Sequence, residues 1–157
     1  MKENKVLILG IGNYLMGDEG LGVHLAESLS ENELPAGIDI LDGGTGGFHL
    51  LEYFENYSSV ILVDATLDKE DIGRIRLIRP KFASDFPRAM STHDIGMRDL
   101  IAALQFMDKI PDVHLFAVSI TPEQMQGIEL SQEIQKVMPD LRTQVAALAK
   151  KLLSEAK

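Results

Sequence analysis

The 157-residue sequence predicts an α/β protein, a three-layer α/β/α sandwich built on a five-stranded, mostly parallel, twisted sheet. Two observations lead to this prediction. Apolar runs of strand length alternate with helical stretches along most of the chain. Some of these runs also lack the polar alternation of a half-exposed strand, which indicates burial on both faces. No repeat or linker interrupts the pattern, so residues 1–157 are expected to form a single domain.

Five runs are predicted to form the strands. They lie at 6–11, 38–44, 59–65, 73–80 and 113–120. The first and the third are apolar over most of their length, which is typical of strands with both faces covered. The run at 73–80 alternates less regularly and is expected at an edge of the sheet, and one antiparallel strand is expected.

Helices are predicted between these strands. Asp18 is expected to cap the first helix. Further helices are expected after Thr45 and after Ser91 or Thr92, and the tail is expected to hold a short helix and then a longer one that begins at Pro139. The apolar residues expected to face the core from these helices are Leu21, Leu25, Leu29, Phe48, Leu51, Phe54, Leu100, Ile101, Leu104, Leu141, Val145, Leu148 and Leu152.

The composition argues against several classes of protein. The chain contains no cysteine, which excludes disulfides, thiolate metal ligands and a cysteine nucleophile. The formal net charge is −9 and no basic cluster is present, so no nucleic-acid partner is expected. No stretch approaches the roughly 18 apolar residues of a membrane span. A cytoplasmic monomer without membrane association is therefore expected.

A glycine-rich loop, "LGIGNYLMGDEGLG", follows the first predicted strand. Its glycines at positions 10, 12 and 17 do not match the dinucleotide pattern G-x-G-x-x-G, and the Gly-Lys pair of a phosphate-binding P-loop is missing. The adjacent carboxylates Asp18 and Glu19 would repel a phosphate. Nucleotide binding is therefore disfavoured, and the glycines are expected to leave Glu19 accessible to the backbone of a substrate.

Carboxylates stand where predicted strands end. Glu19 lies in the loop after the first strand, Asp42 at the end of the second and Asp64 at the end of the third. In open parallel sheets the ligand site lies outside the carboxyl ends of the strands. A structural role as a helix cap is sufficient to explain Asp18. For Glu19 and Asp64, the residues alone leave both a structural and a functional role open.

One of the four histidines stands at the start of a predicted helix, in the segment "STHDIG". The helix dipole disfavours protonation of His93 at this position, and neutral imidazole is the form that binds metal ions. His24 and His114 are expected to be structural, and His49 is a weaker candidate for the site.

Glu19, Asp64 and His93 together offer two carboxylates and one imidazole. Three protein ligands that leave coordination positions open are typical of a catalytic or recognition metal site rather than a closed structural one. Oxygen and nitrogen ligands admit zinc, nickel or manganese, and the sequence does not choose among them.

Five motifs in order resemble one known family, the hydrogenase maturation proteases. The motifs are "LGIGNYLMGDEGLGV", "DGGTGG", "VILVDA", "STHDIG" and "VSITPEQMQGIELS". The resemblance runs from about residue 6 to about residue 131, which leaves only the last predicted helix without a motif. Five ordered motifs are far more specific than any one of them.

The resemblance implies a twisted sheet with helices on both faces, and an endopeptidase that removes the C-terminal extension of a [NiFe] hydrogenase large-subunit precursor. It implies that Glu19, Asp64 and His93 contact a metal ion and that Asp42 takes part in function. Nickel already bound in the precursor is the implied recognition signal. A zinc- or cadmium-like divalent ion would fit the same ligands.

Two mechanisms and one different function stay open. In the first mechanism, a metal ion held by Glu19, Asp64 and His93 polarises the scissile carbonyl and activates water. In the second, these residues bind the nickel of the precursor while Asp42 or Glu19 acts as general base. The different function is a non-catalytic, nickel-binding accessory module that docks on a metalloenzyme precursor without cutting it.

Overall fold

The protein has the predicted α/β fold, and its five strands follow one another along the chain as predicted. The computed structural model describes residues 4–30, 34–45, 50–80, 102–103, 105–106 and 111–155. Its five strands are β1 (Val6–Gly10), β2 (Ile38–Asp42), β3 (Ser59–Thr66), β4 (Ile75–Ile78) and β5 (Asp112–Ser119). Their order across the sheet is β2-β1-β3-β5-β4. All neighbours are parallel except β4, which pairs antiparallel with β5 at one edge.

β4 directly follows β3 in the sequence but does not pair with it. Both sides of β3 are occupied, by β1 on one side and β5 on the other. β4 therefore forms one position further out, at the edge of the sheet, and β5 lies between β3 and β4. Leu77 of β4 is half exposed there, as expected of an edge strand.

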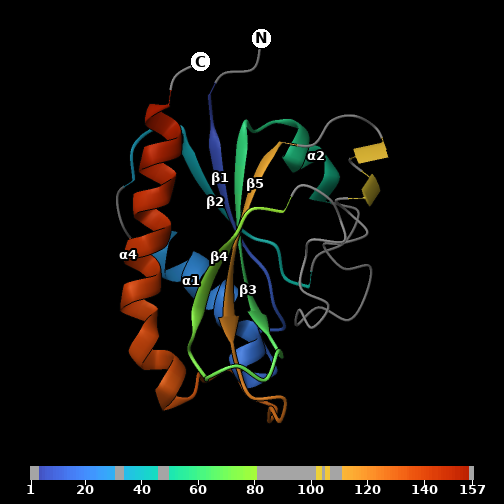
Figure 1. The fold of residues 1–157 in the computed structure, drawn as a ribbon, viewed down its shortest axis with the longest axis vertical. Helices are drawn as coiled ribbons and strands as arrows, with labels where there is room; N and C mark the ends of the chain where they lie inside the picture. The colour runs from blue at the N-terminus through green and yellow to red at the C-terminus, as the bar shows by residue number, and fades with distance from the viewer. Residues whose placement is uncertain are drawn as a thin grey trace.

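Helices cover both faces of the sheet (Figure 1). They are a 3₁₀ turn η1 (Gly17–Gly20), α1 (Leu21–Ser30), α2 (Leu51–Glu55) and α4 (Gln132–Ser154). Helices α1 and α4 pack on one face, and α2 lies on the other. Residues 102–103 and 105–106 are also helical. The predicted helix start at Ser91 or Thr92 lies outside the described residues.

Strand alternation divides the core between the two faces. Val6 and Ile8 of β1 belong to the cluster beneath α1 and α4, whereas Leu7 and Leu9 pack with Phe54 of α2. Successive side chains of a strand point to opposite faces, so a strand that is apolar at every position must be covered on both. β1 and β3 are buried throughout, which confirms the prediction.

The C-terminal helix differs from its prediction. Gln132–Ser154 form one helix of 23 residues, and Pro139 lies inside it rather than at its start. The helix begins after Ser131, whose Oγ accepts a hydrogen bond from the Ile134 N–H at 3.4 Å. Proline removes one backbone donor inside a helix. The buried residues Ile134 and Met138 precede it on the face that packs against the sheet, so the apolar stripe continues across the proline.

None of the helices among the described residues is long and apolar enough to span a membrane.

Candidate active site

Three of the predicted site residues lie at the carboxyl edge of the sheet. β1, β2 and β3 run parallel, so their carboxyl ends share one edge. Just beyond β1, the Ile11 N–H donates to the Val63 carbonyl of β3 at 2.9 Å. η1, which carries Glu19, follows this point of contact and is buried over its whole length. Glu19 and Asp64 therefore belong to the same edge.

Asp64 is a carboxylate in the interior of the protein, with no exposed surface. It lies on β3 in alternation with Val60 and Leu62, so its side chain belongs to the α2 face of the sheet. Its Oδ1 accepts a hydrogen bond from the Ala65 N–H at 2.8 Å. Burying an ionised carboxylate is costly unless cations or donors compensate it, and such groups concentrate at functional sites.

Glu19 is buried, which corrects the expectation that the glycines leave it accessible. It is only 7% exposed. A Cβ on Gly12 would lie 2.1 Å from the Glu19 carbonyl oxygen, and one on Gly20 would lie 2.9 Å from the Cα of Tyr14. The glycines of this loop therefore allow segments of its own backbone to pack closely together. The carboxylate sits inside a compact turn.

Asp42 is placed apart from Asp64. It is the last residue of β2 and is exposed. Its Oδ1 accepts a hydrogen bond from the Gly44 N–H at 2.9 Å, which shapes the turn after the strand. Alternation puts Asp42 on the face of Ile38 and Ile40, opposite to the face of Asp64. The two carboxylates share an edge of the sheet but not a face.

The remaining predicted ligand, His93, lies outside the described residues, as does His49. Among the residues that are described, no group of three His, Cys, Asp or Glu side chains is arranged to hold a metal ion. Glu19 and Asp64 supply oxygen donors of the kind that divalent ions accept. The two buried carboxylates therefore fit part of the predicted ligand set.

Asp18 does not cap the first helix, contrary to prediction. It is the second residue of η1, and no side chain caps that turn. Its Oδ1 instead accepts a hydrogen bond from the Ser131 N–H at 2.7 Å, across 113 residues of chain. Ser131 is the N-cap of α4. The negative charge thus lies at the N-terminus of a long helix, where the helix dipole favours it.

We expect Asp18→Ala to lower the free energy of unfolding by about 1.5–3 kcal/mol, because it leaves the Ser131 N–H without its charged acceptor. Asp18→Asn keeps an acceptor oxygen and should cost about 1 kcal/mol or less. Thermal unfolding of the two variants measures the difference. An Asp18→Ala protein that melts with the wild type would show that this hydrogen bond does not stabilise the fold.

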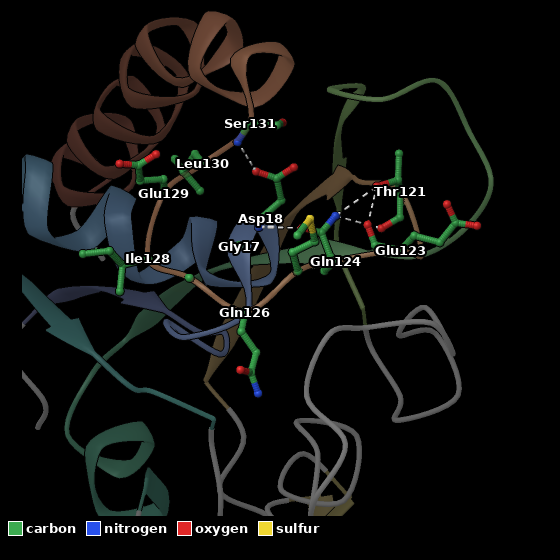
Figure 2. Close-up of a pocket in the computed structure, with 12 residues that line it drawn as sticks. Gly17, Asp18, Thr121, Glu123, Gln124, Gln126, Ile128, Glu129, Leu130 and Ser131 are labelled. Atoms are coloured by element: carbon green, nitrogen blue, oxygen red, sulfur yellow. Dashed lines mark hydrogen bonds between the residues drawn. The ribbon is translucent and has the colours of Figure 1, made fainter.

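A pocket of about 550 Å³ opens beside η1 (Figure 2). Its walls are Gly17, Asp18 and most residues of the segment 121–131, called here the 121–131 loop, which connects β5 to α4. The Asp18 N–H donates to Gln124 Oε1 at 2.8 Å, and the Gly17 N–H donates to the Gly127 carbonyl at 2.8 Å. The pocket is therefore contiguous with the turn that carries Glu19.

Known proteins resemble this chain over nearly its whole length. A family model described as hydrogenase maturation protease matches residues 23–148. The hydrogenase 2 maturation protease of Escherichia coli (strain K12) is 34% identical over 149 residues, which are 92% of this chain and 90% of that protein. The chain belongs to the hydrogenase maturation protease family. It is accordingly a peptidase, as the motifs predict.

Solved structures of this family share the fold. The hydrogenase maturating endopeptidase HybD from E. coli superposes with a TM-score of 0.80 at 31% identity, covering 94% of this chain and 93% of that one. The [NiFe] hydrogenase maturation protease HycI from Thermococcus kodakarensis KOD1 gives a TM-score of 0.73 at 26% identity, with the same coverage. The α/β fold with a mostly parallel sheet is thus the fold of these proteases.

Two histidines of this maturation protease have structural partners. His24 Nε2 lies 2.8 Å from the Ile128 carbonyl oxygen, and its ring stacks on Tyr14 at a centroid distance of 4.8 Å. His24 thereby connects α1 to the 121–131 loop. His114 is buried, and its Nε2 lies 3.0 Å from Oδ2 of Asp112 at the start of β5. Both contacts agree with the expected structural roles.

An ion pair that no motif indicates holds the connection between β3 and β4. Asp68 Oδ2 accepts hydrogen bonds from Arg76 Nη2 and from Thr66 Oγ1, and Asp68 Oδ1 accepts one from the Glu70 N–H. Burial raises the pKa of Asp68, but these donors, led by the Glu70 N–H, outweigh it and lower the pKa below its ordinary value. The loop that leaves β3 after Thr66 is therefore fixed by a charged carboxylate.

Proposed function

We propose that this protease removes the C-terminal extension of a [NiFe] hydrogenase large-subunit precursor after nickel insertion, and that the bound nickel is its recognition signal. The observation that supports this most directly is the pair of buried carboxylates, Glu19 and Asp64, at the carboxyl edge of the sheet. The first and third family motifs, which carry these two residues, meet at that edge. The E. coli relative is named a hydrogenase 2 maturation protease.

The carboxylates fit a divalent ion by their chemistry. Two carboxylate oxygens and an imidazole nitrogen, from Glu19, Asp64 and His93, would form an open ligand set for nickel in the precursor or for a zinc- or cadmium-like ion. Such an ion, when bound, polarises a carbonyl and acidifies water. The fully buried Asp64 is fixed by its own strand, so it would offer a ligand of defined position.

The exposed Asp42 has a different place in the proposal. Its carboxylate is held by the Gly44 N–H at the end of β2, on the opposite face from Asp64. It is exposed, so a water molecule can reach its carboxylate. In the proposed mechanism Asp42 accepts a proton from the attacking water and returns it to the leaving amine, and Glu19, Asp64 and His93 would hold the metal ion.

The decisive experiment incubates the protein with a nickel-loaded large-subunit precursor and, in parallel, with the nickel-free precursor. We expect a single cut near the C-terminus of the nickel-loaded form only, seen as one loss of mass by mass spectrometry. Binding of the precursor without any loss of mass would exclude the protease function and favour the accessory module. Equal cutting of the nickel-free precursor would exclude recognition through nickel.

A further inference from the structure

The pocket beside η1 has a fixed shape, and the function proposed above assigns it no role. Four hydrogen bonds described above connect its walls to η1, α1 and α4, through Asp18, Gly17 and His24. A further bond joins the Gly127 N–H to the Leu15 carbonyl at 2.8 Å. The 121–131 loop is thus held on both sides of the turn that carries Glu19. A ligand in this pocket would lie next to the candidate active site.

The described walls of the pocket carry negative charge only. Asp18, Glu123 and Glu129 are acidic, and none of the described lining residues is Lys or Arg. Figure 2 shows Glu123 and Glu129 on opposite sides of Asp18. Both glutamates are exposed. Clefts lined by one sign of charge attract groups of the opposite sign and increase their rate of association.

The same surface exposes large apolar side chains. Met125 is 84% exposed and Ile128 51% exposed on the 121–131 loop, and Leu15 is 65% exposed on the segment that pairs with it. Two of these exposed apolar residues, Met125 and Ile128, line the pocket itself, where they can contact a bound segment. Apolar contacts within an acidic rim are typical of a surface that binds another protein.

We propose that this pocket binds a positively charged segment of the hydrogenase large-subunit precursor, with apolar side chains of that segment against Met125 and Ile128. The inference rests on the proposed function for the identity of the precursor. The charge of the walls selects a Lys- or Arg-containing segment rather than an acidic one. Binding here positions the precursor beside Glu19 without taking part in the bond cleavage.

The test compares two double variants, each of which removes two negative charges. Glu123→Gln with Glu129→Gln neutralises the pocket, whereas Glu52→Gln with Glu155→Gln neutralises exposed glutamates on α2 and after α4. Figure 1 shows α2 and the C-terminus at the end of the molecule opposite to the 121–131 loop. For each variant we would measure KM and kcat for the nickel-loaded precursor, and its binding affinity, at low and at high salt.

The pocket variant, Glu123→Gln with Glu129→Gln, is expected to have a KM and a dissociation constant about two- to thirtyfold higher than the wild type at low salt. This is the effect of losing two exposed ion pairs. Its kcat should stay within about twofold of the wild type, and the difference should shrink at high salt because salt screens exposed charges. The second variant, with Glu52 and Glu155 changed, should behave as the wild type. Met125→Ser should weaken binding equally at both salt concentrations.

The possible failures are distinguishable. If the wild type cuts the precursor but the pocket variant binds it as tightly as the Glu52/Glu155 variant does, the docking proposal is wrong and the proposed function stands. If the wild type binds the precursor without cutting it, while the pocket variant binds it more weakly, the docking surface stands and the proposed function fails. A stronger effect in the Glu52/Glu155 variant would also overturn the docking proposal.

Discussion

Asp64→Asn is expected to abolish processing of the precursor and to leave the protein folded. Asparagine has nearly the shape of aspartate, and its Oδ1 can keep the hydrogen bond that Asp64 accepts from the Ala65 N–H. The substitution therefore replaces a buried carboxyl group by an amide of nearly the same shape and keeps this hydrogen bond. Loss of a metal-binding or proton-transferring carboxylate reduces the rate by about 100-fold or more. Cleavage of the nickel-loaded precursor, followed by mass spectrometry, measures this loss.

The control is Asp39→Asn on β2, which is separated from β3 by β1; Asp39 lies near the start of its strand, away from the carboxyl ends that carry the candidate site. Asp39 is exposed on β2 and accepts a hydrogen bond from the Tyr57 hydroxyl at 2.6 Å. It should keep full cleavage activity. Thermal unfolding of the Asp64 variant near the wild-type temperature would show that the loss is chemical. A fully active Asp64→Asn protein would exclude the carboxylate from the reaction, and an unfolded one would assign it a structural role.

Asp42→Asn tests the general base of the second mechanism that the sequence leaves open. Asp42→Asn keeps an acceptor for the Gly44 N–H, so the turn after β2 should persist. If Asp42 is the general base, this variant loses cleavage but still binds the nickel-loaded precursor. If it cuts the precursor at the wild-type rate, the base is a different residue, and Glu19 is the next candidate.

The strands could be predicted from the sequence because their signal is local. β1 is apolar at every position, and a run of that kind must be covered on both faces wherever it lies in the fold. The predicted strands agree with the observed ones to within two residues at each end. The carboxyl-edge location of Asp64 follows in turn, because parallel strands direct their carboxyl ends to one edge.

The errors concern contacts between residues far apart in the chain. Asp18 stands directly before a helical run, and local capping rules favour it as a cap. Its real partner, the Ser131 N–H, is 113 residues away and carries no local signal. The preference of proline for the first turn predicts a helix start at Pro139, but Ser131 provides the N-cap and the apolar stripe on both sides of the proline keeps the helix continuous.

The glycines of the glycine-rich loop after β1 are a second case in which contacts between distant residues carry no local signal. The sequence suggested that they make room for a substrate, but their free space is filled by the protein itself. A Cβ on Gly10 would lie 2.0 Å from the Gly22 carbonyl oxygen, and one on Gly22 would lie 2.3 Å from the carbonyl oxygens of both Ile11 and Val63. α1 therefore begins directly against the ends of β1 and β3, at a distance that only glycine permits.

Gly22→Ala is accordingly expected to destabilise the fold by about 3 kcal/mol or more, at the upper end of the range for overpacked sites. The atoms that the methyl group would meet belong to the backbone of Ile11 and Val63 and cannot rotate away as a side chain would. Thermal unfolding should show a fall in Tm of roughly 6–12 °C for a chain of this size.

Gly44→Ala is the matched control, since it adds the same methyl group where nothing lies within 4 Å. Gly44 has a φ of +56°, so alanine there costs about 1–2 kcal/mol of backbone strain and no steric overlap. The difference between the two variants isolates the close contact of α1 with the sheet. That contact also sets the position of η1, because η1 ends where α1 begins. If Gly22→Ala melts no lower than Gly44→Ala, α1 can move away from β1 and β3 at little cost, and the placement of Glu19 must depend on the 121–131 loop instead.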